Sequence, residues 1–132
     1  MSDFELEALR SHPDAGPVVM LNLLKFRPRS RDGNGTGMEA YTRYANVAQR
    51  LVEARGGRVV WVGFVDHPAL HQGGGDVEWD AAQLVQYPSR AAFVDMVTDP
   101  EYLAANEHRK NGVEKHVILA TTTMLSAPWP EP

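Results

Sequence analysis

The stretch VVMLNLLKF, residues 18–26, constrains the fold of this chain more than any other segment. Seven of its nine residues are apolar, and they fall on both faces of a strand because successive side chains alternate. An antiparallel strand with one solvated face should instead alternate apolar with polar residues. We therefore expect a strand that is covered on both faces. The segment also carries Asn22 and Lys25, and a buried polar group needs a partner.

A helix is predicted over residues 38–55. Tyr41, Tyr44 and Ala48 belong to an apolar stripe with helical spacing, and Gly56 follows as a terminator. Three further apolar segments resemble the first strand in composition. The predicted strands cover residues 17–26, 58–66, 79–87 and 115–124.

Residues 88–112 are predicted to be helical, with a break near Thr98–Asp99. Ser89 is a good N-cap for the first part, and Asp99 with Pro100 forms a cap and first-turn pair for the second. One or two helical turns are also expected over residues 3–10, capped by Ser2 or Asp3.

The element order is therefore β-α-β-β-α-β, which is the ferredoxin-like split βαβ pattern of the α+β class. It implies a four-stranded antiparallel sheet with two helices on one face. We expect one domain over residues 1–132, with an N-terminal extension at 1–16 and a proline-rich tail at 125–132.

Two helices can cover only one face of this sheet, yet the second strand is also apolar on both sides. We assign Val60, Val62 and Phe64 to one face, and Val59, Trp61 and Val65 to the other. Because monomers rarely expose large apolar patches, a second copy is the simplest cover, and we predict a homodimer that closes a dimeric α/β barrel. Alternatively, the N-terminal extension and the proline-rich tail cover the second face.

Composition excludes several classes of protein. The chain has no cysteine, so it forms neither disulfides nor Cys-ligated zinc sites. Its net charge of −4 argues against a nucleic-acid or anionic-membrane partner, and no apolar run is long enough to span a bilayer. The acidic start MSDFELEALR does not resemble a secretory signal, so we expect a cytoplasmic protein.

Four stretches within residues 17–122 carry a family resemblance: VVMLNLLKF, AYTRYANVAQRLVEARGGRVVWVG, LVQYPSRAAFVDMVTDPEYLAANEHR and HVILAT. The most specific is YPSRAAF followed by DPEY and Arg109. Together they resemble the domain of unknown function 1330 family, a branch of the dimeric α/β-barrel superfamily. The loops at 27–37 and 66–78 look longer than in usual members.

The resemblance implies the fold and the dimer, and fold analogy alone does not assign a reaction. Superfamily neighbours include cofactor-free monooxygenases, lactone isomerases and haem enzymes. We expect a small-molecule-binding protein, acting on a small apolar or aromatic substrate as a cofactor-independent monooxygenase or isomerase. The alternative is a non-catalytic ligand-binding or stress-associated homodimer. No cofactor is predicted.

The candidate ligand-binding residues begin with Asn22, Tyr41 and Tyr44, which would form a polar cluster in an apolar cavity between sheet and helices. The competing interpretation is that Asn22 simply bonds a neighbouring side chain or backbone group. Trp61 and Trp79 are also candidates, although packing anchors are the more common role of such residues.

Two residues near the end of the second helical segment complete the candidate site. Arg109 could meet an anionic ligand, although pairing with Glu101 or Glu114 is favoured. His108 and Asn22 are the candidate catalytic residues, His108 as a general base. Lys25 is expected to reach solvent from the strand end.

Three other motifs carry no chemistry in this interpretation. His67 and His71 have metal-ligand spacing, but Pro68 and the GGG that follows favour a loop, so no metal site is predicted. GNGTG does not match the spacing of a dinucleotide fingerprint. The loop at 27–37 is a flexible loop, with a lid as a hypothesis, and Ser89 is a cap rather than a nucleophile.

Overall fold

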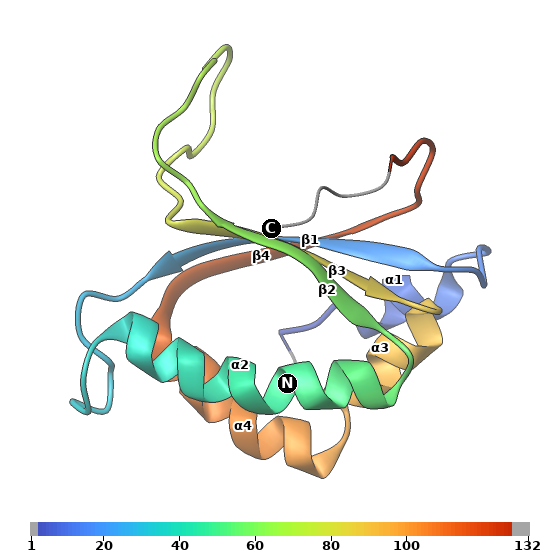
Figure 1. The fold of residues 1–132 in the computed structure, drawn as a ribbon, viewed down its shortest axis with the longest axis horizontal. Coiled ribbons are helices and arrows are strands. Elements are labelled where there is room, and N and C mark those ends of the chain that lie inside the picture. Colours follow the sequence, from blue (N-terminus) through green and yellow to red (C-terminus); the bar gives the residue numbers. More distant parts are fainter. Residues whose placement is uncertain (1–2, 128–132) are drawn as a thin grey trace.

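The computed structural model describes residues 3–127, which form an antiparallel sheet with helices on one face (Figure 1). The strand order is β2-β3-β1-β4, and every neighbouring pair is antiparallel, so the predicted ferredoxin-like topology is confirmed. The elements are α1 (Leu6–Ser11), β1 (Val18–Phe26), α2 (Gly37–Ala54), β2 (Arg58–Phe64), β3 (Ala81–Tyr87), α3 (Arg90–Val97), α4 (Pro100–Gly112) and β4 (Val113–Thr121).

Local sequence explains most helix boundaries. Thr36 and Glu39 form a capping box at the start of α2, and Ser89 and Asp99 cap α3 and α4 as predicted. The first helix differs from its prediction. It begins after Glu5, which makes no side-chain cap, so Asp3 is not the cap, and Ser2 lies outside the described residues.

The strand ends differ from their predicted places by two or three residues. β2 ends at Phe64 and β3 begins at Ala81, which leaves Trp79 outside the sheet. β4 starts at Val113, directly after α4, and ends at Thr121.

A bulge in β2 corrects the predicted assignment of side chains to faces. The register shifts between Val59 and Trp61, so the alternation changes phase at that point. Val59, Val62 and Phe64 lie on the helix side, where they line a cavity, whereas Trp61 lies on the other side opposite Leu84. The simple alternation that we assigned from the sequence was therefore wrong for this strand.

The core lies between β1 and the helices. Val18, Met20 and Leu24 are fully buried there, and Asn22 shares their face. The opposite face of the sheet, which we call the open face, carries the half-buried Leu21 and Leu23 of β1 and has no helix over it (Figure 1).

Within the described residues, the N-terminal segment lies away from the open face and the C-terminal segment borders only part of it (Figure 1). α1 packs against α3 on the helix side of the sheet. At the other end, Leu125 lines a groove with Val19 and Leu84 of the sheet but remains exposed, and residues 128–132 of the predicted tail lie outside the described residues.

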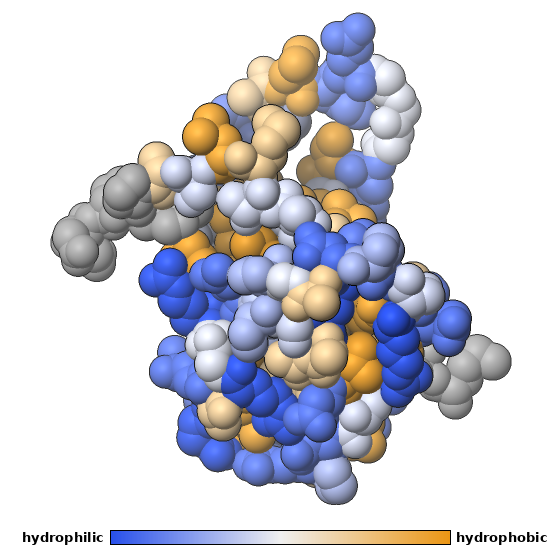
Figure 2. Space-filling view, turned by 90° about the vertical axis from the view of Figure 1, so that its right-hand side faces the viewer, coloured by the Kyte–Doolittle hydropathy of each residue, from blue (hydrophilic) through white to orange (hydrophobic). Residues whose placement is uncertain are grey.

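The two long loops behave differently. The loop from Arg27 to Thr36 is tied to α4, because the amides of Arg27 and Arg31 donate to the carbonyls of Gly112 and Asn111 at 2.8 and 2.9 Å. These bonds satisfy carbonyls that the end of a helix leaves without partners. Residues 65–80 instead stand off the body of the molecule, with apolar side chains on the arm and on the surface beneath it (Figures 1 and 2).

Candidate functional site

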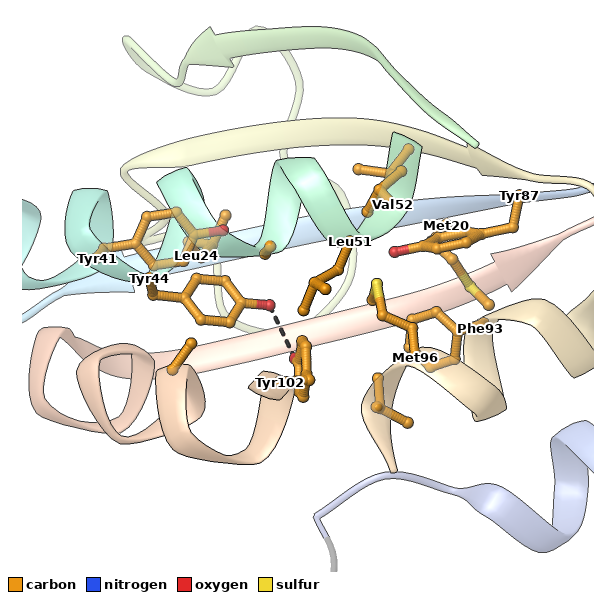
Figure 3. Close-up of a cluster of buried hydrophobic side chains, with 14 of the residues drawn as sticks. Met20, Leu24, Tyr41, Tyr44, Leu51, Val52, Tyr87, Phe93, Met96 and Tyr102 are labelled. Atoms are coloured by element: carbon orange, nitrogen blue, oxygen red, sulfur yellow. Dashed lines mark hydrogen bonds between the residues drawn. The ribbon is translucent and has the colours of Figure 1, made fainter. Parts of the chain in front are cut away.

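A cavity of about 290 Å³ lies between the sheet and α2, and we call it the tyrosine cavity. All four tyrosines of the chain line it. Tyr41 and Tyr44 come from α2, Tyr87 from the end of β3 and Tyr102 from the first turn of α4. The hydroxyls of Tyr41, Tyr44 and Tyr87 turn toward the same central region (Figure 3). Most other lining residues are apolar, which is the usual composition of a ligand pocket.

The mouth of the tyrosine cavity lies between α2 and β2, where the helix leaves the outer strand uncovered. Val62 and Phe64 are exposed there, Phe64 to 73%, and Met38 faces them from α2. Exposed apolar side chains at the rim of a pocket are suited to an apolar ligand.

Three of the four phenols have hydrogen-bond partners in the protein. The hydroxyls of Tyr44 and Tyr102 lie 2.8 Å apart and bond to each other. Gln83 Nε2 donates to the Tyr41 oxygen at 2.9 Å, so the hydroxyl proton of Tyr41 remains available to a ligand. The Tyr87 hydroxyl has no hydrogen-bond partner among residues 3–127, although the residue is only 4% exposed.

Burial keeps these phenols protonated. It raises the pKa of Tyr41 to about 12 and also raises the pKa values of Tyr44, Tyr87 and Tyr102. At neutral pH they are therefore hydrogen-bond donors rather than bases. Such donors can stabilise negative charge that develops on a ligand oxygen.

A series of buried polar side chains begins at Asn22, on the wall of the tyrosine cavity, and leads away to His116 and Arg109, which line a neighbouring cavity. Asn22 Nδ2 donates to the Met20 carbonyl at 3.2 Å, and Asn22 Oδ1 lies 2.9 Å from His116 Nε2. His116 Nδ1 lies 3.2 Å from Arg109 Nη1, and Arg109 Nε donates to Asn106 Oδ1 at 2.7 Å.

The hydrogen bonds to Arg109 and Asn22 define the tautomer of His116. A guanidinium can only donate, so Nδ1 of His116 accepts from Arg109 and the proton lies on Nε2, which donates to Asn22. Burial, with a smaller effect of the Arg109 charge, lowers the pKa of His116 to about 3. The imidazole is therefore neutral at physiological pH, with both nitrogens bonded.

The candidate residues from the sequence are not all in one place. Asn22, Tyr41 and Tyr44 line the tyrosine cavity, and Asn22 also bonds both a backbone group and a side chain. Arg109 lines a second, adjacent cavity. Its nearest carboxylate is that of Asp3 at 3.8 Å, not that of Glu101 or Glu114, which pair with Arg50 and Lys25.

The structure brings neither tryptophan to the tyrosine cavity. Trp61 lies on the open face across Gly63, where it is 41% exposed. Trp79 precedes β3, donates from Nε1 to the Asp76 carbonyl and lies under the Lys115 ammonium, 5.2 Å from its ring centre.

His108 also lies apart from the tyrosine cavity. It is on α4, close enough to Asp32 of the 27–36 loop to lower the pKa of that carboxyl, although Ser30 has the largest effect. The buried Nδ1 of His108 has no hydrogen-bond partner.

Sequence reasoning did not single out Gln83, Tyr87 and His116. For His116 a signal was present, because alternation in KHVILAT places it on the face of Ile118, and a buried imidazole needs partners. Gln83 and Tyr87 reach the cavity through the register of β3, which depends on strand pairing rather than on local sequence.

Two further features are absent from residues 3–127. No group of three or more potential ligands (His, Cys, Asp or Glu) is arranged to hold a metal ion. None of the helices combines the length and apolar character needed to cross a bilayer.

Solved structures share the fold. A protein of unknown function from Rhodopseudomonas palustris is 34% identical over 96% of each chain, with a TM-score of 0.81. SnoaB, a cofactor-independent oxygenase from Streptomyces nogalater, is 14% identical over 87% of this chain and all of its own, with a TM-score of 0.56. A dabb family protein with a ferredoxin-like fold from Mesorhizobium loti is 14% identical over 83% of this chain and 98% of its own, with a TM-score of 0.51.

Sequence comparison gives the family. No functionally curated protein matches the chain. The model of the domain of unknown function DUF1330 matches residues 34–123, well over half of the chain. The predicted resemblance is confirmed, and the chain belongs to the DUF1330 family.

Proposed function

We propose that the protein binds a small apolar or aromatic molecule with an oxygen function in the tyrosine cavity and acts on it without a cofactor, as a monooxygenase or isomerase. The observation that carries the proposal is the Tyr87 hydroxyl, which has no hydrogen-bond partner in the described chain and is directed into an apolar cavity. A ligand oxygen in this cavity would supply the partner that the hydroxyl lacks.

The polar groups suit a reaction that passes through an enolate or phenolate. Tyr87 and Tyr41 can donate to the substrate oxygen and stabilise the charge that develops there. An enolate so stabilised can be reprotonated at another carbon, which is isomerisation, or can react with dioxygen, which is oxygenation. The fold shared with SnoaB, a cofactor-independent oxygenase, is compatible with the second route.

One observation favours the non-catalytic alternative. Every phenol in the cavity has a raised pKa, and the imidazole of His116 is bonded at both nitrogens, so these groups offer no strong base at neutral pH. A substrate acidic enough to lose its proton to water would not need a base from the protein. A protein that only binds its ligand would not need one either.

The test uses 2-tetralone, an aromatic ketone that exchanges its C1 protons through an enolate. We expect saturable binding, faster exchange of those protons for deuterium by NMR, and a loss of about tenfold to a hundredfold in exchange rate for Tyr87→Phe. Oxygen uptake would identify the monooxygenase route. Trp79→Phe, which lies outside the sheet and away from the tyrosine cavity, is the matched control and should behave like the wild type.

The other outcomes are informative. Binding without exchange would favour the non-catalytic alternative. Equal exchange rates for Tyr87→Phe and the wild type would show that the Tyr87 hydroxyl takes no part in the reaction. Absence of 2-tetralone binding would contradict the proposal.

We also propose that the open face is covered by a second copy of the chain. The half-buried leucines of β1 and the partly exposed indole of Trp61 lie on this face, and none of the described helices covers it. The proposal agrees with the apolar pattern on both faces of β1.

A further inference from the structure

A second cavity, of about 350 Å³, lies between α1 and the helix side of β4, and we call it the arginine cavity. Its apolar wall includes Leu9, Met20, Phe93 and Ile118, of which the last three also line the tyrosine cavity. The two cavities are therefore neighbours that share a wall. What distinguishes this one is the charge that it encloses.

Arg90 is 5% exposed, and it lines both the arginine cavity and a neighbouring groove beside α1 and α3. Its two hydrogen bonds go to neutral acceptors, the Asp14 carbonyl and the Thr122 hydroxyl, and both are long at 3.4 Å. Among residues 3–127, no carboxylate lies within 4.0 Å of it. The Asp14 carboxylate itself accepts from the Gly16 amide.

The position of Arg90 in its helix makes the lack of a counter-ion more unusual. It is the first residue of α3, where the positive end of the helix dipole disfavours a cation. A buried charge is costly unless it is paired and hydrogen-bonded. Neither local helix stability nor an ion pair explains why an arginine occupies this position.

The other charges around the arginine cavity do not neutralise Arg90. Arg109, 8% exposed, adds a second positive charge, and His116 is neutral. The acids that line the cavity, Asp3 and Glu5, are exposed to solvent, and Asp3 lies nearest to Arg109. The cavity therefore combines an apolar wall with buried positive charge.

We propose that the arginine cavity binds a small monocarboxylate with an apolar body. The carboxylate forms a paired hydrogen bond with the Arg90 guanidinium, and the body packs against Phe93 and Ile118. Arg90 is the anchor rather than Arg109, because both of its hydrogen bonds are long at 3.4 Å, whereas Arg109 bonds Asn106 at 2.7 Å and lies 3.8 Å from the Asp3 carboxylate. A planar guanidinium matches a carboxylate in geometry and supplies the charge-assisted bonds that it lacks here. This site is separate from the tyrosine cavity and does not depend on the function proposed for it.

The test is calorimetric titration of the intact protein with octanoate at neutral pH, beside 1-octanol and inorganic phosphate. We expect octanoate to bind, and the other two to bind at least about tenfold more weakly, since each supplies only half of the recognition. Arg90→Gln should weaken octanoate binding about tenfold or more and leave octanol unchanged. Arg58→Gln, an exposed arginine on β2, is the matched control and should bind like the wild type.

A second measurement locates the ligand and does not require a variant to fold. The Arg90 side-chain Nε–H resonance of the wild-type protein should shift on addition of octanoate in a ¹⁵N correlation spectrum. Arg90→Lys, which keeps the charge, should bind with intermediate affinity. The proposal is overturned if this resonance does not move, if Arg90→Gln binds octanoate as the wild type does, or if octanol or phosphate binds as tightly as octanoate.

Discussion

Asn22 occupies the centre of β1 because His116 and the Met20 carbonyl provide partners for its amide. Asn22→Leu would leave the Nε2 proton of His116 without an acceptor in a buried place. We expect a loss of about 1–3 kcal/mol in the free energy of unfolding, measured by urea denaturation. Gln72→Leu, on the exposed arm, is the control and should be nearly neutral. A loss below about 0.5 kcal/mol for Asn22→Leu would show that the bond to His116 adds little to stability.

His116 should make stability depend on pH. Its folded pKa of about 3 lies below its ordinary value of 6.5, so the unfolded chain binds a proton that the folded chain excludes. The contribution is fully present above about pH 6.5 and is lost as the pH falls from there toward 3, with a slope of at most about 1.4 kcal/mol per pH unit.

The variant His116→Gln separates this effect from the titration of exposed carboxylates. A glutamine keeps a donor and an acceptor but does not titrate. Urea denaturation between about pH 7 and pH 4 should show a steeper decline for the wild type than for His116→Gln. Parallel curves would mean that His116 is not held neutral in the folded protein.

For single residues, the sequence was most informative where the burial of a side chain could be inferred from the apolar residues next to it in sequence. The polar cluster of Asn22, Tyr41 and Tyr44 was expected because all three interrupt or join apolar patterns. Lys25 was expected at a strand end, where it pairs with Glu78 and Glu114. The burial of Arg90 was not predicted, because a helix start is usually exposed and the cover comes from α1, a tertiary contact.

At the scale of elements, α2 and α4 meet through two glycines. A Cβ atom on Gly112 would lie 2.4 Å from the Gly37 carbonyl and 2.8 Å from the Tyr41 amide, both backbone atoms that cannot move independently. Gly112→Ala should therefore destabilise the protein by about 1–3 kcal/mol or more, with the helices pushed apart.

The control for this prediction is Gly74→Ala, because a Cβ atom there meets nothing within 4 Å. It should change the free energy of unfolding by no more than about 0.5 kcal/mol. Thermal and urea unfolding of both variants would check the difference. Equal stability of the two variants would contradict the close approach of the helices.

The sequence predicted the order and type of the strands and of the helices from α2 to α4, because their apolar periodicity and caps are local signals. It did not predict the bulge in β2. A bulge is set by pairing with β3, and its effect is large: it moves Val59 to the helix side and changes which side chains reach the tyrosine cavity. The loop at 27–36 was likewise assigned as flexible, because its bonds to the end of α4 involve residues distant in sequence.

At the scale of the whole molecule, the apolar pattern of β1 predicts that both faces of the strand are buried, and the helices of the structure bury one of them. The helix side is packed, while the open face presents Leu21, Leu23 and Trp61. An apolar face of this kind on the central strand of a sheet suits the two-fold association that we propose. The sequence could predict that a cover is needed, because this follows from alternation alone.

The association can be measured by native mass spectrometry and light scattering. We expect the wild type to have twice the chain mass of 14.6 kDa. Leu21→Asp, which places a charge on the open face, should give the single-chain mass while circular dichroism shows a folded protein, since the side chain does not enter the core between sheet and helices. Leu103→Asp is the matched control, because Leu103 is an exposed leucine of α4 on the other side of the molecule, and it should stay dimeric. A wild type with the single-chain mass would contradict association through the open face, and dissociation by Leu103→Asp alone would place the contact on the helices instead.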